Sequence, residues 1–182
     1  SFSFEVVEKD KKKLKTLKKI HKKFNFYSEI PSKWNGAVLI FATKPQAFKS
    51  VSEEIVIKKL KTRTIVSIMA GINTTTLRSN LKFPTNIIRA MPNKASEVMM
   101  GVTCIYSKTI LTNYKRKVIN RLFTPLGKCV WIKKELLMDS VTAISGSGPA
   151  YFYLFIYSLI NIAKSLGFKN NLARELVVST AI

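Results

Sequence analysis

The feature that most constrains this chain is an apolar stretch at residues 138–167, interrupted once by Ser-Gly-Ser-Gly-Pro at residues 145–149. The proline suits the first turn of a helix, where no backbone N–H is needed. The run after it, residues 150–163, is apolar on nearly every face when it is read as a helix. We therefore expect two helical pieces joined by a hinge, with Ser145 and Ser147 capping the helix ends.

A helix that is apolar all round must be covered by a large core, by another subunit or by a membrane. The hinge leaves roughly 14 uninterrupted apolar residues, whereas a membrane-spanning helix needs about 20. A membrane span is therefore the less favoured interpretation. The favoured one is the core of a dimer, made by the aromatic residues Tyr151, Phe152, Tyr153, Phe155 and Tyr157.

Short apolar runs of strand length precede this helical part. They lie at residues 37–42, 64–70, 86–91, 102–106 and 129–132, after a strand-like piece at residues 2–7. Helical patterns separate several of them, at about residues 9–24, 52–61 and 112–123. This alternation is typical of an α/β fold with a mostly parallel sheet and crossover helices. The run at residues 37–42 is apolar throughout, which predicts a strand covered on both faces.

The formal net charge of +21 raises the question of nucleic-acid binding. Lysine accounts for most of the 31 basic residues, whereas arginine reads phosphates and base edges better. Nine lysines fall within residues 9–23, where apolar residues recur at helical spacing: Leu14, Leu17, Ile20 and Phe24. This pattern favours an amphipathic helix with a solvated lysine face. A basic nucleic-acid-binding module remains the less favoured alternative.

Other kinds of site have little support in the sequence. Cys104 and Cys129 have no metal-ligand spacing, which favours a reducing compartment. The only histidine, His21, lies in the lysine helix. Residues 145–149 match neither a nucleophile elbow nor a dinucleotide-binding loop, because no strand precedes them. No basic segment followed by an apolar core marks a signal peptide, so we expect a cytoplasmic protein.

In parallel sheets, ligands bind beyond the carboxyl ends of the strands. Here those ends carry Thr43-Lys44-Pro45, Ala70-Gly71 and Pro92-Asn93. Together with residues 139–151, these turns resemble the pyrroline-5-carboxylate reductase family. The similar blocks are Phe41-Ala42-Thr43-Lys44-Pro45-Gln46, Val66-Ser67-Ile68-Met69-Ala70-Gly71, Ile88-Arg89-Ala90-Met91-Pro92-Asn93, and Asp139-Ser140-Val141-Thr142-Ala143-Ile144 continuing through Ser-Gly-Ser-Gly-Pro-Ala-Tyr. They follow the family's order and cover about residues 3–180.

The resemblance implies a Rossmann-like, mostly parallel sheet that lacks its first strand, followed by part of an all-helical dimerisation domain. We place these at residues 1–133 and 134–182. It also implies an NAD(P)H-dependent oxidoreductase that reduces 1-pyrroline-5-carboxylate to L-proline, the last step of proline biosynthesis, and that forms a homo-oligomer. A protonated imine is already electrophilic, so no catalytic acid–base residue is assigned and no metal is expected.

Residues of the cofactor site can be carried over one by one from the resemblance. Thr43 and Lys44 would touch the ribose–nicotinamide side of NAD or NADP, with Pro45 fixing the turn. Ala70 would pack near the nicotinamide, and Asn93 would stand beside its reactive end.

Glu8 and Lys9 fall where family members contact the adenosine ribose. The glutamate favours the free 2′-hydroxyl of NAD and the lysine favours the 2′-phosphate of NADP, so the preference stays open.

The sequence also departs from the family's pattern. The family opens with a strand and a Gly-rich turn, but the first glycine here is Gly36. The family's substrate loop would lie beyond Ile182, so the chain is expected to be truncated at both ends. The usual Asn-Thr-Pro-Ala reads Asn-Lys-Ala-Ser at residues 93–96. A non-catalytic remnant or a split subunit of the reductase is therefore an alternative to an active enzyme.

Overall fold

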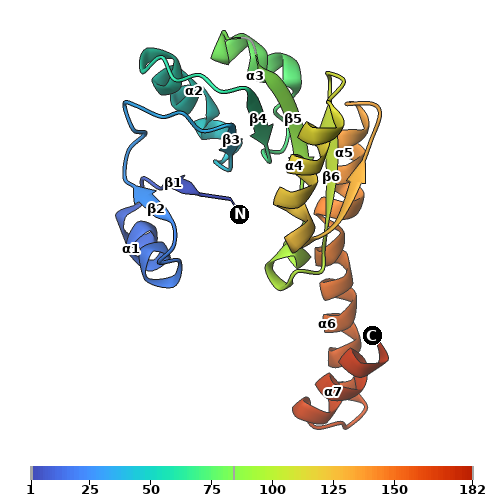
Figure 1. The fold of residues 1–182 in the computed structure, drawn as a ribbon. Helices are drawn as coiled ribbons and strands as arrows, with labels where there is room; N and C mark the ends of the chain where they lie inside the picture. The colour runs from blue at the N-terminus through green and yellow to red at the C-terminus, as the bar shows by residue number, and fades with distance from the viewer. Residues whose placement is uncertain (1, 84, 182) are drawn as a thin grey trace.

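The computed structural model of this chain describes residues 2–83 and 85–181. Figure 1 shows a twisted sheet with helices packed against it and a helical arm, α6 and α7, that projects from one end. A small second sheet lies beside the larger one. Ser1 and Ile182, on which the predicted chain ends depend, lie outside the described residues.

The larger sheet contains five strands in the order β3-β4-β5-β6-β7. Their bounds are Val38–Phe41, Thr64–Ser67, Asn86–Met91, Gly101–Ser107 and Gly127–Trp131. Neighbouring strands pair in parallel except β5 and β6, which are antiparallel. The predicted mostly parallel sheet is therefore confirmed. Only a short 3-10 helix, Lys94–Val98, connects β5 to β6, because an antiparallel pair needs no crossover helix.

The small sheet is formed by β1 (Glu5–Val7) and β2 (Asn25–Tyr27), which pair in parallel. The helix α1 (Lys11–Ile20) connects the two strands. Within the described residues β1 does not join the larger sheet, although the sequence predicted one sheet for all the strands. The lysine helix is shorter than predicted. Of its apolar positions only Leu14 is buried, and Ile20 is 65% exposed.

Three helices cover the larger sheet: α2 (Phe48–Ile57), α3 (Thr74–Leu81) and α4 (Asn113–Phe123). The prediction placed the start of α2 too late, because the proline at residue 45 begins a 3-10 turn that leads straight into it. The sequence reasoning missed α3 and β2. Helix α3 is mostly polar and begins after Asn73, whose side chain accepts a hydrogen bond from the Thr76 N–H.

The core lies on both faces of the sheet. Ile65 and Ile87 pack with α2 and α3 on one face, and Val66 and Ile88 pack with α4 on the other. All four are essentially inaccessible to solvent. Successive side chains of a strand point to opposite faces of the sheet, and helices cover both faces here. Strand β3 differs from the prediction because it is an edge strand, which leaves Ile40 38% exposed.

The predicted hinge in the apolar stretch is wrong, because the helix is continuous there. Helix α5 (Leu137–Val141) passes through a π-helix, Thr142–Gly146, into α6 (Gly148–Ser165). The Ser147 N–H donates to the Thr142 carbonyl (2.8 Å), so the wider turn absorbs the extra residue without a break. Ser147 therefore makes no capping bond through its side chain, and Ser145 lies within the π-helix.

The arm exposes its apolar side chains. The five aromatic residues of α6 named above are 56–69% exposed, and Gly148 is the only buried residue of α6. Helix α7 (Asn170–Thr180) packs beside α6. Because the helix does not break, Leu137–Ser165 is long and apolar enough to cross a membrane by length and composition, whereas the predicted hinge made a membrane span the less favoured interpretation.

Candidate cofactor edge and domain junction

The turns after β3, β4 and β5 lie at the same end of the sheet, where these strands end. We call this place the candidate cofactor edge. The three strands are parallel, with Phe41 paired to Ser67 and Ser67 paired to Arg89, so their carboxyl ends lie side by side. The Thr43 hydroxyl donates to the Met69 sulfur (3.4 Å), which links the first two turns directly. The structure therefore brings together the predicted site residues that follow these three strands.

The turn after β3 keeps its lysine in solvent. Lys44 has the extended backbone typical of a residue before proline (φ −63°, ψ 143°). Its carbonyl accepts a hydrogen bond from the Ala47 N–H at 3.0 Å, which closes the 3-10 turn that begins at Pro45. The Lys44 side chain is exposed and Pro45 is half-buried. This edge therefore presents a cation on a turn of restricted geometry.

The turn after β4 is open. Gly71 has φ +72°, a conformation that strains residues with a side chain, and no atom lies within 4 Å of where its Cβ would be. Ala70 beside it is exposed. A planar ring can therefore approach the backbone of this turn closely.

Asn93 follows β5 and is half-buried. Its side-chain oxygen accepts a hydrogen bond from the Val102 N–H (3.1 Å), at the beginning of β6. One end of the carboxamide is thus occupied by the fold. This bond fixes the direction of the side chain at the sheet edge.

Glu8 and Lys9 lie apart from this group, at the end of β1. The Glu8 carboxylate accepts a hydrogen bond from the Asp10 N–H (2.9 Å). The Lys9 ammonium pairs with Glu54 at 2.9 Å, in the second half of α2. Hydrogen bonds and charge from Lys9 and Lys58 hold the pKa of Glu54 below its ordinary value, against the opposing effect of burial.

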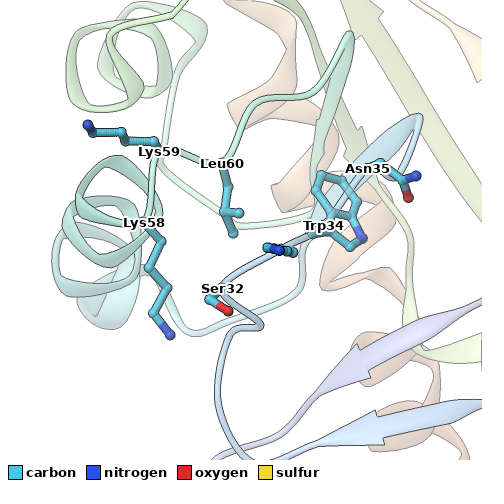
Figure 2. A pocket seen from close by; sticks show the side chains of 7 residues that line it. Ser32, Trp34, Asn35, Lys58, Lys59 and Leu60 are labelled. Atoms are coloured by element: carbon cyan, nitrogen blue, oxygen red, sulfur yellow. The ribbon is translucent and has the colours of Figure 1, made fainter.

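A hollow in the surface lies at the opposite edge of the sheet (Figure 2). It is lined by residues 32–35, which precede β3, and by residues 58–60, which precede β4. The amino ends of parallel strands are not where ligands bind in such folds. The hollow is therefore separate from the candidate cofactor edge.

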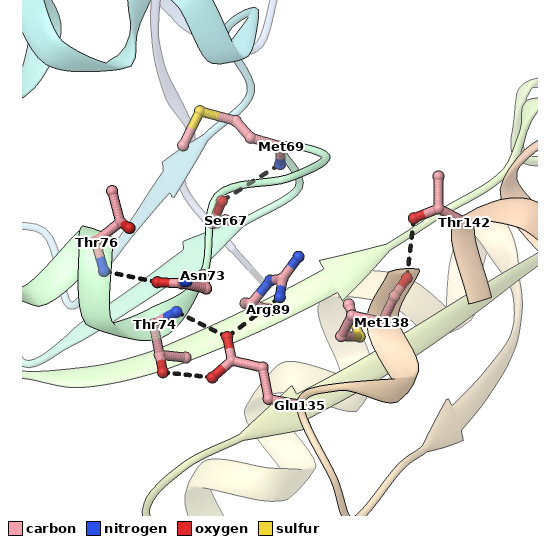
Figure 3. A network of polar contacts seen from close by, with 9 residues as sticks. All are labelled: Ser67, Met69, Asn73, Thr74, Thr76, Arg89, Glu135, Met138 and Thr142. Atoms are coloured by element: carbon pink, nitrogen blue, oxygen red, sulfur yellow. Dashed lines mark hydrogen bonds and ion pairs between the residues drawn. The ribbon is translucent and has the colours of Figure 1, made fainter. Parts of the chain in front are cut away.

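A polar network joins the sheet to the start of the helical arm (Figure 3). The Glu135 carboxylate accepts bonds from the Thr74 N–H (2.7 Å), the Thr74 hydroxyl (2.6 Å) and Arg89 Nη1 (3.2 Å). Burial raises the pKa of Glu135, but the hydrogen bonds from Thr74 and Arg89 outweigh it and hold the pKa below its ordinary value. Burial and the Glu135 charge raise the pKa of Tyr106, which pairs with Arg89 across β5 and β6.

Sequence reasoning missed this network, although one signal for it was present. Arg89 stands within an apolar strand, and arginine is almost never fully buried unless it is paired. Its side chain is only 4% exposed. The partner could not be found from the pattern, because Glu135 lies 46 residues further along the chain.

The comparisons with known proteins agree on one family. Residues 135–182 match the family model described as pyrroline-5-carboxylate reductase dimerisation. A pyrroline-5-carboxylate reductase from Pseudomonas aeruginosa is 32% identical over 145 residues, covering 80% of this chain and 53% of the relative. The one from Mycobacterium leprae is 32% identical over 151 residues, covering 80% and 51%. The chain thus spans about half the length of the curated relatives it matches.

Solved structures extend the match to nearly the whole chain. A pyrroline-5-carboxylate reductase from Coxiella burnetii superposes with a TM-score of 0.85 at 26% identity, covering 97% of this chain and 66% of the other. The Plasmodium falciparum pyrroline carboxylate reductase, solved with NADP bound, gives 0.76 at 32% identity, covering 87% and 61%. The chain belongs to the pyrroline-5-carboxylate reductase family.

Proposed function

We propose that this chain takes part in the NAD(P)H-dependent reduction of 1-pyrroline-5-carboxylate to L-proline. The observation that carries the proposal is the edge where three parallel strands end in the Lys44, Ala70 and Asn93 turns, in a chain that belongs to this family. The Plasmodium relative with NADP bound supports a nicotinamide cofactor. When bound, the reduced nicotinamide supplies the hydride that converts the imine into an amine.

The residues at this edge fit the nicotinamide side of such a cofactor. The exposed Lys44 and the neighbouring Thr43 would touch the ribose–nicotinamide side of the cofactor. The open Ala70–Gly71 turn would admit the flat ring, and the fixed carboxamide of Asn93 would orient its reactive end. The chain's own contribution is orientation and charge compensation, since a protonated imine needs no further activation.

No residue of this chain is assigned to the pyrophosphate of the cofactor. Dinucleotide pyrophosphates sit on a Gly-rich turn at a helix N-terminus, and the first glycine here is Gly36. On the adenosine side, Glu8 and Lys9 each have a partner within the chain. A 2′-phosphate would compete with Glu54 for Lys9, so NAD and NADP both remain proposed cofactors.

Cofactor binding is tested by calorimetric titration of the chain with NADPH and with NADH. Lys44→Ala should weaken binding by about tenfold, as the loss of a hydrogen bond to a charged group does. The matched control is Lys61→Ala, which removes an exposed lysine before β4, at the opposite edge. Equal affinities for the two variants would remove Lys44 from the proposed site.

The reaction is tested by following NADPH consumption with 1-pyrroline-5-carboxylate as substrate. The alternative function is that of a non-catalytic remnant or a split subunit; the chain spans about half the length of the curated relatives it matches. The same assay is therefore repeated with added segments carrying a Gly-rich first strand and the family's C-terminal helices. Turnover only in the mixture indicates a split subunit, and no turnover in either indicates a remnant.

We further propose that a second copy of the chain covers the exposed face of α6 in a cytoplasmic homo-oligomer. The match of residues 135–182 to a dimerisation model supports this assignment over a membrane span. Large exposed apolar patches mark such interfaces in water-soluble proteins. Sedimentation of the purified chain without detergent tests it, and material that sediments as a discrete species only in detergent would favour the membrane.

A further inference from the structure

Three segments of the chain meet at one carboxylate. Glu135 is bonded to Thr74, the first residue of α3, which follows the Ala70–Gly71 turn. It is also bonded to Arg89, on the strand β5 that ends just before Asn93. It lies two residues before α5, the helix that continues through the π-helix into the arm. A single side chain therefore joins two turns of the candidate cofactor edge to the base of the arm.

Each of these bonds is strong for a physical reason. A carboxylate that accepts from the N–H of a first helical residue satisfies an otherwise unpaired donor at the positive end of the helix dipole. Arg89 depends on the same carboxylate, because its Nε and Nη2 have no hydrogen-bond partner among residues 2–83 and 85–181. Removing Glu135 would therefore leave the charge of Arg89, whose side chain is only 4% exposed, without this partner.

Two hydrogen bonds link Glu135 to the start of the π-helix that leads into the arm. Its backbone carbonyl accepts a hydrogen bond from the Met138 N–H (2.9 Å), and the Met138 side chain is completely buried. The Met138 carbonyl in turn accepts from the Thr142 hydroxyl (2.9 Å), at the start of the π-helix. The arm thus leaves the sheet through a short segment held by these two hydrogen bonds, the second of which is drawn in Figure 3.

We propose that Glu135 is a positioning residue that fixes the direction of the helical arm relative to the candidate cofactor edge. The inference deepens the proposed function, since in an oligomer the arm's direction decides where a neighbouring subunit stands relative to Lys44, Ala70 and Asn93. The alternative role is purely local, in which Glu135 only caps α3 and the rest of the arm's packing sets its direction.

The test measures the arm's direction without cofactor or substrate. Spin labels are placed at Lys117→Cys, exposed on α4, and Lys164→Cys, exposed on α6, with Cys104 and Cys129 replaced by alanine. Labelled chain is diluted with excess unlabelled chain so that only distances within one chain contribute. A narrow distribution of distances is expected for the otherwise unchanged protein.

Glu135→Ala should broaden or shift this distribution. Thr74→Val, which removes the hydroxyl donor, should do so to a smaller extent, and Thr74→Ser, which keeps it, should restore the narrow distribution. The control Glu97→Ala removes an exposed carboxylate of the same charge, which pairs with Lys94, and should change nothing. A distribution for Glu135→Ala as narrow and centred as that of the control would overturn the proposal.

Hydrogen exchange separates direction from local capping. The Thr74 amide should exchange about tenfold faster or more in Glu135→Ala, because a bond to a charged acceptor is lost. Faster exchange with an unchanged distance distribution would assign Glu135 the local role only and contradict the proposal. Neither measurement depends on turnover, so a failed reductase assay leaves both results interpretable.

Discussion

The sheet and the helical arm use the same apolar chemistry and reach opposite degrees of burial. Strands β4 and β5 place residues such as Ile65 and Ile88 at 0% exposure, between helices supplied by the same chain. Helix α6 carries residues that are as apolar, yet Phe152 and Phe155 are more than half exposed. The difference shows that a hydrophobic pattern predicts that a face will be covered, but not by which chain.

The comparison also explains why the two regions meet at a polar network. Arg89 belongs to the buried sheet and Glu135 to the base of the exposed arm. A purely apolar contact would be non-directional, whereas hydrogen bonds to a carboxylate have defined geometry. The junction is thus built from the kind of contact that can set an angle between the two regions.

The largest effect is expected from opening the sheet's core. Ile88→Ala should lower the free energy of unfolding by about 2–5 kcal/mol, because it removes apolar contacts and leaves a cavity. Chemical denaturation followed by circular dichroism measures the change. The matched control is Ile110→Ala, at a fully exposed position, which should stay within about 0.5 kcal/mol of the unchanged chain. Similar losses for both variants would mean that the sheet is not packed as described.

Much of the sheet could be predicted from the sequence, because each of its strands overlaps a mostly apolar run, and the runs of β4 and β5 are followed by Gly71 and by Pro92-Asn93. The run at residues 86–91 was predicted with the bounds that β5 has. Helix α3 was missed because only Leu77 and Leu81 among its residues are buried hydrophobics, too few to give a helical period. The antiparallel direction of β6 could not be read either, because direction depends on a connection whose short 3-10 helix has no strong sequence signal.

The candidate site was predictable only where a local sequence pattern marks its residues. Lys44, Ala70 and Asn93 follow strands directly, so parallel topology brings them to one edge. The hinge prediction failed because glycine and serine next to proline usually end a helix, whereas here a π-helix keeps the backbone bonded. Pairing over long sequence distances, as between Arg89 and Glu135, leaves no local pattern at all.

The second-largest effect is expected in the helical arm, where the exposed apolar face of α6 is the candidate interface. Phe155→Glu places a charge on the exposed apolar face of α6 and should weaken self-association by about tenfold or more, since truncating a central interface residue typically costs that much. Analytical ultracentrifugation over a range of concentrations measures it. The unfolding of the sheet should not change, because Phe155 is exposed within the chain.

The control for this variant is Ile20→Glu, which places the same charge at a similarly exposed apolar residue of α1. It should leave self-association unchanged. Equal weakening by both substitutions would point to a general effect of charge. No weakening by Phe155→Glu would exclude this part of α6 from the interface.

The smallest effect concerns the contact that ties the small sheet to the large one. Glu54 on α2 pairs with Lys9 at 2.9 Å and with Lys58 at 3.2 Å, and these lysines hold its pKa below the ordinary value of 4.5. A lowered pKa in the folded state means that the pair stabilises the protein fully above the unfolded-state pKa. That contribution is lost as the pH falls through the lower folded-state value.

Glu54→Gln should therefore cost about 0.2–1 kcal/mol at neutral pH, the range for surface pairs, and progressively less on acidification below pH 4.5. Urea denaturation at a series of pH values measures the difference from the unchanged chain. Glu53→Gln removes the neighbouring exposed carboxylate and is the matched control. If the two variants lost the same stability at every pH, the ion pair would contribute nothing. The small sheet would then be held to the large one by the packing of Ile30 and Trp34 against the core.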